Sequence, residues 1–210
     1  WGPLVFANLD GKAPPLAEML GTIPERVAHF GCESMRYVMR KEWSLDCNWK
    51  VYVDNYLEGY PIPVVHPGLM RVLDYGAYRT ETFRDRVLQV SPIRGAEAGG
   101  EASYWWIFPN LMLNVYPDNF STNLIVPVGH DRTLTIFEWY FRDPESAKPQ
   151  IEETIKFSDE IQIEDIEICE AVQRGLNSST YSAGRYSPAR ENGVHHFHGL
   201  YARDMGIARR

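Results

Sequence analysis

A stretch near the C-terminus constrains the fold most, because residues 144–176 have the composition of one long helix. Pro144 and Pro149 stand near its start, where a helix tolerates proline, and Gly175 stands near its end, where glycine favours a stop. The stretch between Pro149 and Gly175 is about 26 residues long, and at a rise of 1.5 Å it would span roughly 39 Å. A helix of that length can cross a whole sheet, so we expect it to form one layer of the domain.

The middle of the chain changes to a strand pattern. Residues 35–47 fit a first strand, and five later segments are rich in valine, isoleucine, threonine and aromatic residues. Those five segments are 79–90, 103–108, 111–116, 121–127 and 132–142. Short connections predict antiparallel neighbours. We therefore expect an α+β fold in which a curved antiparallel sheet grips the long C-terminal helix, with a ligand cavity between them.

Length and charge limit the possible partners. The chain has 210 residues, of which 44% are hydrophobic, and a net charge of −7. This is enough for one domain with a buried core, and we expect residues 1–210 to form a single domain. The negative charge argues against nucleic acid as a partner, and no apolar run reaches the roughly 20 residues that span a membrane.

The cysteines and the N-terminus predict the cellular context. Cys32, Cys47 and Cys169 are odd in number and widely spaced, so we expect free thiols and a cytoplasmic location. The N-terminal residues lack the basic region of a signal peptide. The sequence does not begin with methionine, and it reads like the middle of a longer protein.

The segment NWKVYVDNYLEGYPIPVVHPGL at 48–69 carries the first candidate functional residues. Its first half has the apolar spacing of a helix, on which Asn55 and Glu58 share a polar face, and prolines then end the helix. His66 follows an apolar run, so we expect its side chain to point from a partly buried turn. A histidine in such a turn is a candidate metal ligand.

Asp165 is the candidate carboxylate. Three- and four-residue spacing predicts a buried helix face, which holds Asp165 together with Ile161, Ile168, Cys169 and Val172. A buried carboxylate is unfavourable unless it is paired, hydrogen-bonded or bound to a metal, and no cationic residue lies three or four positions away. Metal ligation would explain it, and so would a hydrogen bond or ion pair from another element. We expect four glutamates to form the solvated side of the helix or its rim: Glu160, Glu164, Glu167 and Glu170.

A second group of histidines lies in the segment HHFHGLYAR. Alternation along a strand would put His196 and His198 on one face and His195 on the other. This spacing alone is a weak metal signal, so we expect these histidines to be structural.

Three segments resemble the C-terminal catalytic domain of Rieske non-haem iron oxygenase α subunits. The first is 48–69, the second is PNLMLNVYPDNFSTNLIVPVG at 109–129, and the third joins EDIEICEAVQRGL at 164–176 with GVHHFHGLY at 193–201. Together they cover nearly the whole chain in the order and spacing of the family. The second and third segments are most similar to the choline monooxygenase-like branch, whereas related bacterial sequences are assigned to aromatic ring hydroxylation.

The resemblance implies a helix-grip fold of the START/Bet v 1 type, a homotrimer, and a mononuclear ferrous iron held by two histidines and one aspartate. The matching positions are His66, Asp165 and residue 61, where this sequence has Pro61 in place of the family's first histidine. Asn55 and Glu58 are the candidate catalytic residues, and Glu58 matches the acid that links the iron site to the cluster of the neighbouring subunit. The substrates implied are O2 and a small organic molecule, either aromatic or a quaternary amine.

The resemblance also implies that electrons come from a separate reductase or ferredoxin through a Rieske [2Fe–2S] cluster. Such a cluster needs paired cysteine and histidine motifs, which this sequence lacks. We therefore expect the N-terminal Rieske domain to be absent from this chain.

Pro61 leaves three interpretations open, because proline has no side-chain donor atom. The first interpretation is that the chain is a fragment or variant of a working oxygenase α subunit and is inactive alone. The second is that it is a ligand-binding domain that has kept the fold and lost the metal. The third interpretation is that a substitute ligand near residues 54–66 retains the iron.

Overall fold

The computed structural model describes residues 1–9, 11–58, 65–96 and 100–207. Its centre is a seven-stranded antiparallel sheet with the strand order β1-β7-β6-β5-β4-β3-β2. The strands are β1 (Arg36–Leu45), β2 (Arg79–Thr82), β3 (Arg86–Pro92), β4 (Glu101–Ile107), β5 (Leu111–Val115), β6 (Asn119–Pro127) and β7 (Thr133–Phe141). From β2 to β7 each strand pairs with the next along the chain, and β1 pairs with β7. The predicted antiparallel sheet is confirmed.

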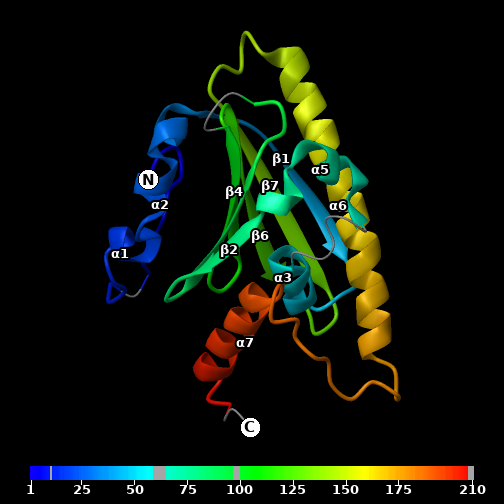
Figure 1. Cartoon of the computed structure of the whole chain (residues 1–210). Coiled ribbons are helices and arrows are strands. Elements are labelled where there is room, and N and C mark those ends of the chain that lie inside the picture. Colours follow the sequence, from blue (N-terminus) through cyan, green and yellow to red (C-terminus); the bar gives the residue numbers. More distant parts are fainter. Residues whose placement is uncertain (10, 59–64, 97–99, 208–210) are drawn as a thin grey trace.

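Helices cover both faces of this sheet (Figure 1). They are α1 (Leu16–Leu20), α2 (Ile23–Val27), α3 (Trp49–Leu57), α5 (Pro67–Val72), α6 (Lys148–Leu176) and α7 (Asn192–Asp204), with short 3-10 helices at Ala28–Phe30, Cys32–Ser34 and Tyr75–Ala77. Side chains alternate along a strand, so the neighbours Trp105 and Trp106 enter different cores. Trp106 packs with α3, α6 and α7, whereas Trp105 packs with α1 and α2. No helix within the described ranges has the length and apolarity that a membrane span requires.

The long helix α6 lies along the side of the sheet that α3 and α5 also occupy (Figure 1). It has 29 residues and begins at Lys148, later than expected, with Pro149 in its first turn. Its buried Gln162 accepts a hydrogen bond from the Tyr52 hydroxyl of α3 at 2.5 Å and donates to Thr135 Oγ1 of β7 at 3.0 Å. These contacts fix α6 against both the sheet and α3, because a buried amide needs its partners.

The expected strand over residues 79–90 is a hairpin of two strands, β2 and β3. The chain turns at residues 83–85, where Phe83 N–H donates to the Arg86 carbonyl at 2.9 Å. The prediction missed this turn because the strand-forming residues on both sides hide a short charged break at Arg84 and Asp85.

The expected strand through His195, His196 and His198 is wrong, because this segment is helix α7. Val194, Phe197 and Leu200 are buried at three-residue intervals, which is the helical pattern. Their burial against α3 and the sheet outweighs the polar–apolar alternation of the histidines.

Replacing Gln162 with leucine should test how α6 is held. The Tyr52 hydroxyl would stay buried without its acceptor, so we expect the free energy of unfolding to fall by about 1–3 kcal/mol in urea titrations. Ile163→Ala is the matched control, because the neighbouring Ile163 is 53% exposed and its truncation should change stability by less than about 0.5 kcal/mol. Equal losses in the two variants would contradict this role for Gln162.

Candidate metal centre

Hydrogen bonds join helix α3 to α6 near both ends of α3. Asn48 caps α3 by accepting from Lys50 N–H at 3.1 Å, and its own N–H donates to Gln173 Oε1 of α6 at 2.8 Å. Two turns later, Asn55 Nδ2 donates to Asp165 Oδ1 at 2.6 Å. The contacts of Asn48 and Asn55 together hold one face of α3 against the segment of α6 that contains Asp165.

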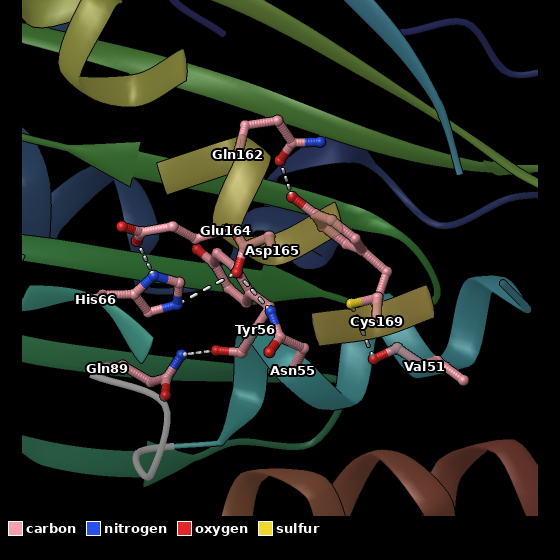
Figure 2. A network of polar contacts seen from close by, with 10 residues as sticks. Val51, Asn55, Tyr56, His66, Gln89, Gln162, Glu164, Asp165 and Cys169 are labelled. Atoms are coloured by element: carbon pink, nitrogen blue, oxygen red, sulfur yellow. Dashed lines mark hydrogen bonds and ion pairs between the residues drawn. The ribbon is translucent and has the colours of Figure 1, made fainter. Parts of the chain in front are cut away.

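His66 lies between two consecutive carboxylates of α6 (Figure 2). The residue caps the start of α5, and only 6% of its side chain is exposed. Its Nε2 lies 3.3 Å from Asp165 Oδ1, and its Nδ1 lies 2.8 Å from Glu164 Oε2. The sequence prediction that His66 and Asp165 converge from a turn and a distant helix therefore agrees with the geometry.

The predicted buried face of α6 needs one correction. Cys169 is buried as expected, but Val172 is 43% exposed and lies outside the buried face. Glu164 was expected on the solvated side or its rim; its side chain is 34% exposed, and its carboxylate contacts His66. Because α5 packs against α6 and brings His66 to this turn, a residue at the edge of the solvated face becomes a partner.

The electrostatics of the pair favour a charged imidazole when no metal is bound. Burial lowers the pKa of His66, but hydrogen bonds to Asp165 and Glu164 and the charges of these carboxylates outweigh burial and raise it overall. His66 Nε2 and Asp165 Oδ1 face each other, so a metal ion could take the place of the proton between these two atoms.

The donor atoms of His66 and Asp165 fit two positions of a mononuclear iron site. Two ligands about 2.1 Å from one ion lie roughly 3.0–3.3 Å apart at near-right angles, and the observed separation is 3.3 Å. The contact from Glu164 to the other ring nitrogen is the arrangement that orients metal-bound histidines. Pro61, the third position of the family pattern, lies outside the described residues. Among the residues described, no three His, Cys, Asp or Glu side chains form a metal-binding group.

A cavity of about 450 Å³ opens beside this pair, between the sheet, α3, α5 and α6. His66, Asp165, Asn55 and Glu58 all line it. The predicted site residues are therefore brought together in the predicted place, and their chemical roles stay predictions.

Glu58 ends α3 and stands beside a charged cluster that the sequence did not predict. Burial raises the pKa of Glu58 to about 7, with further contributions from the charges of Asp54 and Glu191. His198 Nε2 contacts Asp54 Oδ1 at 2.9 Å and so ties α7 to α3, while its Nδ1 contacts the hydroxyl of Tyr186. His198 is thus structural as expected, although through a helix and not a strand.

Comparison with known proteins identifies the class to which this fold and site belong. Choline monooxygenase of Arabidopsis thaliana, described as chloroplastic, is 37% identical over 99% of this chain and 54% of its own length. The carnitine monooxygenase oxygenase subunit of Escherichia coli (strain K12) is 30% identical over 94% of this chain and 58% of its own length. The chain spans about half the length of these relatives.

Solved structures agree with the sequence relatives. The quaternary ammonium Rieske monooxygenase CntA, in complex with an inhibitor, has a TM-score of 0.82 at 27% identity and covers 93% of this chain and 57% of its own. Its complex with the substrate L-carnitine has a TM-score of 0.77, also at 27% identity, with the same coverage of both chains. The architecture is thus that of the catalytic domain of Rieske non-haem iron oxygenases.

A family model described as "Ring hydroxylating alpha subunit (catalytic domain)" matches residues 32–207. The chain belongs to this family.

The raised pKa of Glu58 predicts how the stability of the metal-free domain depends on pH. The folded state keeps this proton up to about pH 7, whereas the unfolded chain releases it near pH 4.5, so stability should fall as pH rises between these values. Glu58 is partly exposed, and solvent screening reduces the contribution to about 1–2 kcal/mol.

Urea titrations of wild type and Glu58→Gln at pH 5 and pH 8 test this prediction. The substitution should shrink the stability difference between the two pH values. Glu18→Gln is the control, because Glu18 has a 56% exposed side chain and should leave the difference unchanged. An undiminished difference in Glu58→Gln would contradict the assignment.

Proposed function

We propose that this chain is the catalytic domain of an oxygenase that hydroxylates a quaternary amine with O2. The observation that carries the proposal is the 3.3 Å approach of His66 Nε2 to Asp165 Oδ1 on the wall of the cavity between the sheet and α6. The choline and carnitine monooxygenases among its relatives favour a quaternary amine over the aromatic substrates of other family members. A cytoplasmic location and a homotrimer belong to the same proposal.

His66 and Asp165 would hold the ferrous iron, which activates oxygen when bound. Glu164 fixes the orientation of the His66 ring, and Asn55 does the same for the Asp165 carboxylate. The cavity limits access of water and holds the substrate beside these two ligands. Asn55 and Glu58 are the candidate catalytic residues, since both line the cavity next to the proposed iron ligands.

Electrons would reach this site from outside the 210 residues. We infer that a separate reductase or ferredoxin delivers them through a Rieske [2Fe–2S] cluster, and that Glu58 links this site to the cluster of a neighbouring subunit. Pro61 removes one iron ligand of the family pattern, and two protein ligands make a weak site for ferrous iron. The chain by itself should therefore be inactive.

Restoring the missing ligand tests this function. Pro61→His should bind about one ferrous ion per chain after anaerobic loading, whereas the unmodified chain should retain well under half as much, because a third donor completes the facial set. Iron would be counted by elemental analysis after desalting.

The matched control is the double variant Pro61→His with His66→Ala, which again has only two of the three ligands. It should lose the iron that the single substitution gains. If Pro61→His binds no iron although it is folded, the proposed iron site at His66 and Asp165 is wrong.

A ligand-binding domain without metal is the second candidate function, and Pro61 is the observation that favours it. It predicts tight binding of a small molecule in the cavity by the unmodified chain in the absence of iron. Iron near one per chain in the unmodified protein would exclude it and would instead support a substitute ligand near residues 54–66.

A further inference from the structure

Apart from His66, the charged side chains that line the cavity are acidic. They are Glu58, Asp118, Glu153 and Asp165. None of the described lining residues is lysine or arginine. Asp118 and Glu153 are exposed, so they would attract a cation toward the cavity from solvent.

Aromatic rings form much of the remaining wall. The aromatic lining residues are Tyr52, Tyr56, Tyr78, Tyr104, Tyr116, Phe137, Trp139 and Phe157. Several of the hydroxyls already bond to the wall itself, since Tyr104 and Tyr116 contact each other at 2.9 Å and Tyr78 donates to Gln89 at 2.8 Å. Aromatic faces attract cations, and quaternary ammonium ions are recognised in this way.

A polar ladder interrupts the aromatic wall on strands β5 and β6, and it consists of Asn114, Ser121 and Asn123. Asn114 accepts from the Tyr56 hydroxyl at 2.9 Å and donates to Ser121 Oγ at 3.0 Å and to Asn123 Oδ1 at 3.2 Å. Both the oxygen and the nitrogen of the Asn114 amide thus have hydrogen-bond partners. Its role is to orient the other two members of the ladder.

Asn123 and Ser121 keep hydrogen-bond donors toward the cavity. Asn123 is 5% exposed and Ser121 is 7% exposed, and both line the cavity. Their oxygens accept from Asn114, but the structure gives no protein acceptor, within its described ranges, to the Asn123 amide hydrogens or the Ser121 hydroxyl hydrogen. Donors that face a cavity form hydrogen bonds with whatever fills it, and a ligand that carries an oxygen group would provide the acceptor.

We propose that the cavity selects a quaternary amine that carries a neutral oxygen group, such as a hydroxyl, and rejects one that carries a carboxylate. This inference rests on the proposed function and deepens it. The aromatic and acidic wall holds the ammonium group, and Asn123 and Ser121 determine specificity by donating to the neutral oxygen. A carboxylate would meet acidic side chains, and the imidazole of His66 is already paired with Asp165 and Glu164, which opposes its binding.

Three ligands separate these contributions in calorimetric titrations of the metal-free chain. Choline has the ammonium and the hydroxyl, ethyltrimethylammonium lacks only the hydroxyl, and L-carnitine adds a carboxylate. We expect choline to bind about 5- to 10-fold more tightly than ethyltrimethylammonium, which matches one neutral hydrogen bond, and more than tenfold more tightly than L-carnitine.

Variants of the ladder then assign the selectivity to residues. Asn123→Leu and, separately, Ser121→Ala should weaken choline binding toward that of ethyltrimethylammonium and leave ethyltrimethylammonium itself unchanged. Two variants are used because the leucine also removes the acceptor for Asn114. Leu124→Ala is the matched control, since Leu124 is the next residue of β6 and is 37% exposed, and it should change neither ligand.

The possible failures are distinguishable. Equal binding of choline and ethyltrimethylammonium, or carnitine binding as tight as that of choline, overturns the selectivity and leaves the quaternary-amine function standing. Failure of all three quaternary amines to bind to the folded chain overturns both the selectivity and the proposed quaternary-amine substrate.

Discussion

The site depends on the orientation of α6 about its long axis, because this orientation decides which of its side chains face His66. Gln162 is buried in the middle of this helix and bonds to Tyr52 on α3 and to Thr135 on β7. Asp165 follows one turn later. The helix orientation that places the Gln162 amide beside its partners therefore also points the Asp165 carboxylate at His66. The alignment therefore comes from a neutral hydrogen-bond pair in the core and needs no metal.

This division between scaffold and ligands explains how a chain with Pro61 can keep the family's architecture. Glu164 and Asn55 hold His66 and Asp165, the two proposed iron ligands, by hydrogen bonds of their own. Both sheet faces carry packed cores, which contribute to the stability of the fold without any bound ion. On the proposed function, Pro61 therefore affects the chemistry of the site more directly than the stability of the domain.

The sequence predicts the sheet, the long helix and the meeting of His66 with Asp165, because each rests on a strong local pattern or a specific family motif. It fails where tertiary packing decides. Helix α7 was missed because burial of Phe197 and its neighbours, and not histidine alternation, sets its conformation. The contacts of Glu164 with His66 and of His198 with Asp54 depend on how helices meet, which spacing along one helix cannot reveal.

Two adjacent residues of α3 contact the α6 side of the cavity and its sheet side. Asn55 contacts Asp165, and the hydroxyl of Tyr56 contacts Asn114, while the Tyr56 carbonyl accepts from Gln89 on β3. A small displacement of this single turn would move the partner of Asp165 and an amide of the sheet together. A change of substrate preference made on α3 would therefore also disturb the proposed iron site, so changes on the strands are the less disruptive route to a new preference.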